Sequence, residues 1–238
     1  MRRTLLAVML SLCCSAQAQL DQILKKADKA LNQRSTSGLS NDKIVAGLKQ
    51  ALQVSTGKTV AATGKPNGFL KNEAIKILLP PKLKTVGTGM RMLGMGAQVD
   101  ELEVGMNRAA EQATPYAKQI FLNAVKRMTF DDARKILTGG DRAATEYFQR
   151  TSSPELTTAF APIVRRSMER VGVVQQYNRV LGSAPGGSAL AGQFDLNKYV
   201  VGKTLDGLFL MLGEEEKKIR KNPAAQTTAL LREVFGGE

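Results

Sequence analysis

The stretch 99–128, VDELEVGMNRAAEQATPYAKQIFLNAVKRM, decides the fold. Its apolar residues recur every three or four positions, which is the spacing of one face of an α-helix. Pro115 interrupts the pattern, because proline has no N–H to donate within a helix, and we therefore expect two consecutive helices. The positions that carry the pattern are Val99, Leu102, Met106, Ala109, Ala113, Ile120, Phe121, Ala124, Val125 and Met128.

Helical spacing continues on the N-terminal side of this stretch. It predicts a short helix over 20–31, a second that begins at Ser40 or Asn41 and ends at Gly64, and a third over 69–79 that stops at two prolines. The glycine-rich residues 87–96 indicate a flexible link. These segments lead to an all-helical N-terminal part.

On the C-terminal side, Thr129 with Asp132 forms a capping box for a helix that ends near Thr138. Asp141 can cap the next helix, and Pro154 indicates the start of another that runs to Leu181 with a kink at Pro162. The remaining segments are a small-residue loop over 183–193, a long helix over 195–221 and a last helix over 222–235.

Because no segment alternates with a period of two, we predict an all-α fold, a helical bundle with short loops and no sheet. Residues 19–98 are expected to form a basic helical N-terminal part and residues 99–238 the main bundle, with 19–238 together as one domain.

Residues 1–18 have the pattern of a cleavable secretory signal. Arg2 and Arg3 precede a short apolar run, and a small-residue box ends at Ala18. A lipid anchor on Cys13 or Cys14 is disfavoured, because neither follows a small residue. We therefore expect cleavage after Ala18 and a periplasmic product, with no later segment apolar enough to span a membrane.

The absent residue types exclude several kinds of chemistry. The chain has no histidine, and its two cysteines lie within the expected signal. Without imidazole or thiol groups, serine or cysteine nucleophile pairs and histidine-bound metals are ruled out. No cofactor and no metal site is expected. The neighbouring Met90, Met92 and Met95 suggest Cu(I) only as a distant third hypothesis.

Positive charge is concentrated in the first third of the mature chain. Residues 19–98 carry 13 basic and 4 acidic side chains, whereas residues 99–238 carry 19 and 17. Such a balance favours an anionic partner. Nucleic acid is disfavoured, because stacking aromatic residues and arginines are scarce in this part. The candidate binding residues are Lys43, Lys49, Lys58, Lys65, Lys71, Lys76, Lys82 and Lys84.

A second set of candidates consists of polar residues within alanine-rich helical motifs. Asn107, Arg108 and Glu111 fall on one helix face, as do Asp141 and Thr145, and inward-facing groups of this kind must be hydrogen-bonded. The simpler interpretation is a buried network that fixes helix register. The set is Asn107, Arg108, Glu111, Asp132, Asp141, Thr145 and Tyr147.

Several motifs together resemble those of the exported bacterial proteins of domain-of-unknown-function family 4197. The resemblance extends from about Leu39 to Gly236 and implies a signal-bearing, mostly helical protein with no assigned activity. The motifs are Met106–Glu111, Met128–Thr129, Asp132–Ala133, Ile136–Leu137 with Gly139, Ala143–Thr145 with Tyr147–Phe148, Leu205–Phe209, Glu215–Glu216, Ile219–Arg220 and Val234–Gly236.

Two functional hypotheses follow. The first is a non-catalytic protein that binds an anionic component of the cell envelope, or a partner protein, through its lysine-rich part. The alternative is a carboxylate-based hydrolase of an envelope polymer, which would use two of the acidic groups Glu111, Asp132, Asp141 and Glu146. Binding is favoured over catalysis, because no pair of nucleophile and base is present.

Overall fold

The computed structural model describes residues 41–170, 172–182 and 195–222. Its contacts divide the chain into two compact units, residues 1–44 and 45–238. Of the first unit only the start of helix α2, Asn41–Gly64, is described. The predicted signal segment, the helices over 20–31 and 222–235 and the loop over 183–193 lie outside the described residues, and the division of the mature chain at residue 98 stays a prediction.

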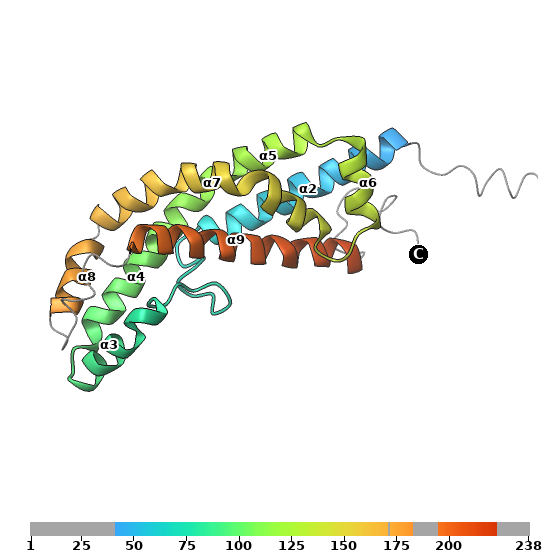
Figure 1. The fold of residues 1–238 in the computed structure, drawn as a ribbon. Coiled ribbons are helices and arrows are strands. Elements are labelled where there is room, and N and C mark those ends of the chain that lie inside the picture. Colours follow the sequence, from blue (N-terminus) through green and yellow to red (C-terminus); the bar gives the residue numbers. More distant parts are fainter. Residues whose placement is uncertain (1–40, 171, 183–194, 223–238) are drawn as a thin grey trace, which may run out of the picture. The chain divides into compact units, whose positions relative to one another are not determined.

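Within the described ranges the regular structure is helical and contains no strand, which confirms the predicted all-α class. Figure 1 shows the order and packing of the helices. After α2 these are α3 (Pro81–Met92), α4 (Gly96–Ala113), the 3-10 turn η1 (Thr114–Tyr116), α5 (Ala117–Arg127), α6 (Phe130–Thr138), α7 (Ala143–Arg170), α8 (Val173–Gly182) and α9 (Leu196–Lys221).

The core of the second unit forms where α7 packs along α9 and α4. Phe121 of α5 joins these layers, with its ring centroid 5.0 Å from that of Phe148 and 6.0 Å from that of Phe209. Tilted and edge-on contacts of this kind stabilise by about 0.5 to 1.5 kcal/mol each beyond the area that they bury. The aromatic cluster therefore ties α5, α7 and α9 together.

Helix α7 continues through Pro154, so the predicted start of a new helix at this residue is wrong. A buried stripe of residues spaced four apart holds the helix against the core: Phe148, Ser152, Leu156, Phe160 and Val164. The hydroxyl groups of Ser153 and Thr158 donate to the carbonyl oxygens of Gln149 and Pro154. Packing thus outweighs the cost of the proline. The helix ends at Arg170 and not near Leu181, and Gly172 with a φ of 71° separates it from α8.

The predicted helix over 69–79 is also wrong. Residues 65–80, which we call the strap, run through turns and then an extended segment. Ile75, Ile77 and Leu79 are buried and alternate with more exposed neighbours, which is the period of extended chain. The following pair Pro80–Pro81 disfavours helix in the preceding residues.

The predicted flexible link over 87–96 is instead the end of α3, a turn and the start of α4. Gly87 is buried in α3, where an added Cβ would lie 2.4 Å from a methyl group of Leu79. Glycine here permits the close approach of the strap and α3 rather than a flexible chain.

Two predicted helix starts are confirmed. Thr129 and Asp132 form the capping box of α6, in which each side chain accepts from the backbone N–H of the other. Asp195 caps α9 by accepting from the N–H of Lys198. Caps of this kind stabilise a helix by about 1 kcal/mol.

Candidate functional site

The strap is held by a row of side chains on α4. Glu103, Asn107 and Glu111 are four residues apart and therefore project from one face of the helix. Each accepts hydrogen bonds from backbone N–H groups of the strap. The row provides the hydrogen bonds that an irregular segment cannot make with itself.

Asn107 binds one residue of the strap in both directions. Its side-chain oxygen accepts from the N–H of Ile77 at 2.9 Å, and its amide nitrogen donates to the carbonyl oxygen of Ile77 at 2.8 Å. The same nitrogen donates to the carbonyl oxygen of Glu103. Asn107 has no exposed surface. A carboxamide has both the donor and the acceptor of a peptide group. The side chain of Asn107 therefore makes with Ile77 the two hydrogen bonds that a neighbouring strand would make in a sheet.

Glu111 caps the first turn of the strap. One carboxylate oxygen accepts from the N–H groups of Phe69 and Leu70, both at 3.1 Å, and the other accepts from Arg108 at 2.6 Å. Arg108 also donates to the side-chain oxygen of Asn67. Asn67 has a φ of 66° at the third position of a turn over residues 65–68, after Pro66 at the second, a conformation that asparagine tolerates. Arg108 and Glu111 thus hold the α2–strap junction.

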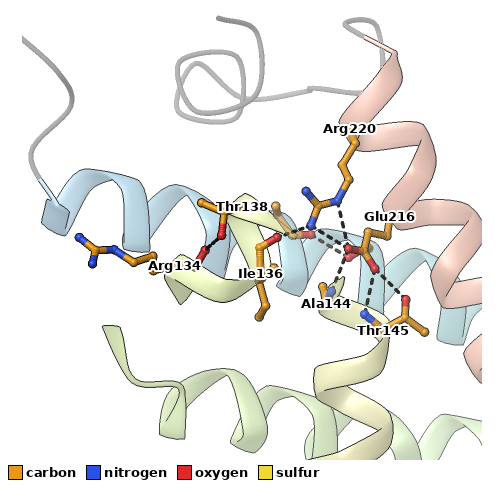
Figure 2. A network of polar contacts seen from close by, with 9 residues as sticks. Arg134, Ile136, Thr138, Ala144, Thr145, Glu216 and Arg220 are labelled. Atoms are coloured by element: carbon orange, nitrogen blue, oxygen red, sulfur yellow. Dashed lines mark hydrogen bonds and ion pairs between the residues drawn. The ribbon is translucent and has the colours of Figure 1, made fainter. Parts of the chain in front are cut away.

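A second buried carboxylate, Glu216 of α9, caps the start of α7 in the same manner (Figure 2). Its two oxygens accept from the N–H groups of Ala144 and Thr145, both at 2.9 Å, and one also accepts from the hydroxyl of Thr145. Arg220 pairs with Glu216 at 2.9 Å and donates to the carbonyl oxygen of Ile136. The two residues connect α6, α7 and α9.

Asp141 lies outside this second network. It is partly exposed and pairs with Lys221 at 2.5 Å, whereas Thr145 is fully buried. The hydrogen bond and charge of Lys221 lower the pKa of Asp141. The structure therefore separates the two residues, which the sequence placed on one inward helix face.

Asp132 and Tyr147 are close to each other in the structure. A hollow of about 220 Å³ between α6 and α7 is lined in part by Asp132, Glu146, Tyr147 and Arg150. Hydrogen bonds from the hydroxyl and backbone of Thr129 lower the pKa of Asp132. The hydroxyl of Tyr147 donates to the carbonyl oxygen of Ala124, and burial raises its pKa. Asp132 is thus kept ionised by its capping role.

The carboxylates named for a hydrolase do not converge. Glu111 lines a different hollow, with Pro66, Gln112 and Pro115, and is held by Arg108 and the strap. Asp132 and Glu146 share a hollow, but the low pKa of Asp132 makes it a poor general acid. The hydrolase hypothesis gains no support from these positions.

Most of the candidate lysines are on the surface. Lys49 and Lys76 are half-buried, and the other six are exposed. Four belong to α2 (Lys43, Lys49 and Lys58) and the junction that follows it (Lys65); Lys71 and Lys76 lie in the strap, and Lys82 and Lys84 at the start of α3.

The methionine hypothesis loses its geometric basis. Met90 is 2% exposed, Met95 is partly buried against the core, and Met92 is 83% exposed. Thioethers that bind one ion must converge, whereas Met90 is buried in the core and Met92 is exposed to solvent. Among the described residues, no cluster of three or more histidine, cysteine, aspartate or glutamate side chains is arranged to hold a metal ion.

Sequence reasoning missed Glu103, Glu216 and Arg220. Glu216 and Arg220 appeared there only within motifs of the family resemblance and not as site candidates, yet Glu216 is 6% exposed. A signal was present, because Glu216 and Ile219 follow Leu212 at helical spacing and so share its buried face.

Comparison with known proteins supports the resemblance seen in the motifs. A family model described as a protein of unknown function, DUF4197, matches residues 38–236. No curated protein and no solved structure matches the chain.

Proposed function

The chain belongs to the DUF4197 family, and from this premise, which assigns no activity, we propose that it is an exported, non-catalytic protein that binds an anionic component of the cell envelope through its lysine-rich surface. By this name we mean the exposed and half-buried lysines of α2, of residues 65–80 and of the start of α3: Lys49, Lys58, Lys65, Lys71, Lys76, Lys82 and Lys84.

The observation that carries the proposal is the state of these seven lysines. None of them makes an ion pair with an acidic group in the described parts of the chain. The only acidic residue between Lys49 and Lys84 is Glu73. Their charge is therefore available to an external anion.

The strap gives part of this surface a fixed backbone. Asn107 and Glu111 bind its main chain, and Phe69 and Ile77 are buried in the core. The lysines of the strap take no part in these contacts, which indicates that folding does not require them. A positive surface on an anchored backbone loses less entropy on binding than one on a free tail.

The positive groups of this surface are lysines, and this indicates which anions it can bind. Lysine offers a compact point charge that serves phosphate or carboxylate groups without a fixed geometry. Export would place the protein among phospholipid head groups, lipopolysaccharide phosphates and acidic wall polymers. A partner protein with an acidic surface is the other ligand that this chemistry permits.

The test is binding of the exported protein to lipopolysaccharide and to anionic vesicles at increasing salt concentration. Replacement of Lys65, Lys71, Lys82 and Lys84 by glutamine should weaken binding at low salt and flatten its salt dependence. The matched control replaces Lys118, Lys126, Lys135 and Lys217, four exposed lysines elsewhere, and changes the net charge equally.

Binding that persists in the control and fails in the first variant supports the proposal. Equal loss in both variants would show that net charge acts without a defined surface. Absence of salt-sensitive binding to either anionic material would overturn the proposal.

A further inference from the structure

The turn between α3 and α4 has a defined geometry. The N–H of Met95 donates to the carbonyl oxygen of Met90 at 2.9 Å. The N–H of Gly94 donates to the carbonyl oxygen of Arg91 at 3.2 Å. Gly94 has a φ of 77°. These are the two hydrogen bonds and the left-handed residue of a Schellman motif, which ends a helix in a fixed turn.

The motif explains two of the four apolar residues at this turn. A Schellman motif commonly includes an apolar contact between the residues that Met90 and Met95 occupy, and both side chains face the core. Met92 and Leu93 lie between them and are 83% and 70% exposed, the highest values among the large apolar residues that the structure describes. The fold would accept polar residues at these two positions.

We propose that Met92 and Leu93, which we call the tip, insert into the boundary between head groups and acyl chains of an anionic phospholipid bilayer. This inference rests on the proposed function and names its ligand. No helix in the described ranges is long and apolar enough to cross a membrane, so the contact is peripheral.

A bilayer fits the tip better than a protein does. The tip is two side chains on a helical turn, whereas a specific protein interface buries about 800 Å² on each partner. A bilayer requires no matching surface, because every apolar group that enters it contributes by its own area.

The attraction to an anionic bilayer comes from the far end of α3 and not from the tip itself. Beside the tip, Arg91 pairs with Asp100 and lies 3.8 Å from Glu103, and Glu101 is a third acidic group on this part of α4. Lys82 and Lys84 stand at the other end of α3 without an ion pair to any described acid. The lysine-rich surface and the tip thus each contribute weakly to membrane binding. Together they can hold the protein at a membrane where either one alone would not.

The experiment uses the absence of tryptophan from the chain. Leu93→Trp creates a single reporter at the tip, and Tyr116→Trp creates one at another exposed apolar position, 56% exposed in η1. The exported variants are mixed with vesicles of three parts phosphatidylethanolamine to one part phosphatidylglycerol, or with soluble polyphosphate. We expect a blue shift of the Leu93→Trp emission with vesicles only, and no shift for Tyr116→Trp.

Affinity gives the second measurement. The double variant Met92→Ser, Leu93→Ser should bind the vesicles about ten- to a hundredfold more weakly, since two apolar side chains no longer leave water. Its binding to polyphosphate should be unchanged. If vesicle binding is unchanged, or if the tip reporter stays unshifted in bound protein, the tip does not insert. If the parent protein binds neither vesicles nor polyphosphate nor lipopolysaccharide, the proposed function itself fails.

Discussion

Asn107 shows how one side chain can replace a neighbouring strand. It binds the N–H and the carbonyl oxygen of Ile77, both in the protein interior. We predict that Asn107→Ala lowers the free energy of unfolding by about 3 kcal/mol, because two buried backbone groups lose their partner at about 1 to 3 kcal/mol each. Urea denaturation measures the change.

A matched variant is Asn178→Ala, in which an exposed asparagine of α8 is removed. It should change the free energy of unfolding by less than about 0.5 kcal/mol. Equal destabilisation by both variants would contradict the role assigned to Asn107.

Glu111 and Glu216 repeat one arrangement at two places. Each is buried, accepts from two successive backbone N–H groups of a distant segment and pairs with an arginine three or four residues away. The hydrogen bonds compensate the cost of a buried carboxylate, and the arginine balances its charge. Both carboxylates thus find their hydrogen-bond and charge partners within the fold.

The Asp132 carboxylate makes α6 sensitive to acid. Its pKa is lowered in the folded protein by the hydrogen bonds from Thr129. The stabilisation is therefore complete above the ordinary pKa of 3.8 and is lost as pH falls through the lower folded value. We predict that Asp132→Asn costs about 0.5 to 1 kcal/mol at neutral pH, near the low end for caps because the group is only partly buried. Denaturation at several pH values should show the difference between the two proteins vanish in acid. A constant difference would contradict it.

At the scale of elements, sequence patterns predicted the helix boundaries that neighbouring residues determine, but not those that distant residues determine. The start of α6 was predictable because Thr129 and Asp132 complete their capping box within four residues. The strap was not, because its local turns are supplemented by hydrogen bonds to side chains of α4, which lie between 24 and 42 residues away in sequence. Pro154 misled for the same reason, since the buried stripe of α7 outweighs a local breaker.

The seating of the strap on α9 depends on Gly207. A Cβ at this position would lie 2.7 Å from the ring of Phe69 and 3.0 Å from Cβ of Ile75. We predict that Gly207→Ala lowers the free energy of unfolding by about 1 to 3 kcal/mol, because the buried strap must move away. Hydrogen exchange should show faster opening at Phe69 and Ile77 than elsewhere.

Gly202 provides the control within the same helix. It is exposed in α9, and no atom lies within 4 Å of its added Cβ. Gly202→Ala should therefore stabilise the protein by up to about 1 kcal/mol. If both alanine variants are equally stable, close packing at Gly207 is not what seats the strap.

At the scale of the whole molecule, the sequence predicted the helical class and part of the polar networks. Asn107, Glu111 and Thr145 were recognised as inward-facing, because each lies in an apolar helical pattern. Their partners were not, since Glu216 and Thr145 are 71 residues apart in sequence. The concentration of positive charge in residues 19–98 can be read from the sequence alone. The tip was recognised only from the geometry of the turn between α3 and α4.

The predicted secretory signal in residues 1–18 can be tested by the place where the protein is recovered. We predict that the protein, expressed with its own leader, is recovered from the periplasmic fraction with Gln19 as its first residue, as N-terminal sequencing would show. Cleavage after Ala18 would remove Cys13 and Cys14, so the mature protein would have no thiol and its melting temperature should not change with reductant. Leu10→Arg interrupts the apolar run of the leader and should retain the uncleaved chain in the cell. Recovery of an exported chain that still begins at Met1 would contradict cleavage, and equal export of both proteins would contradict a signal in residues 1–18.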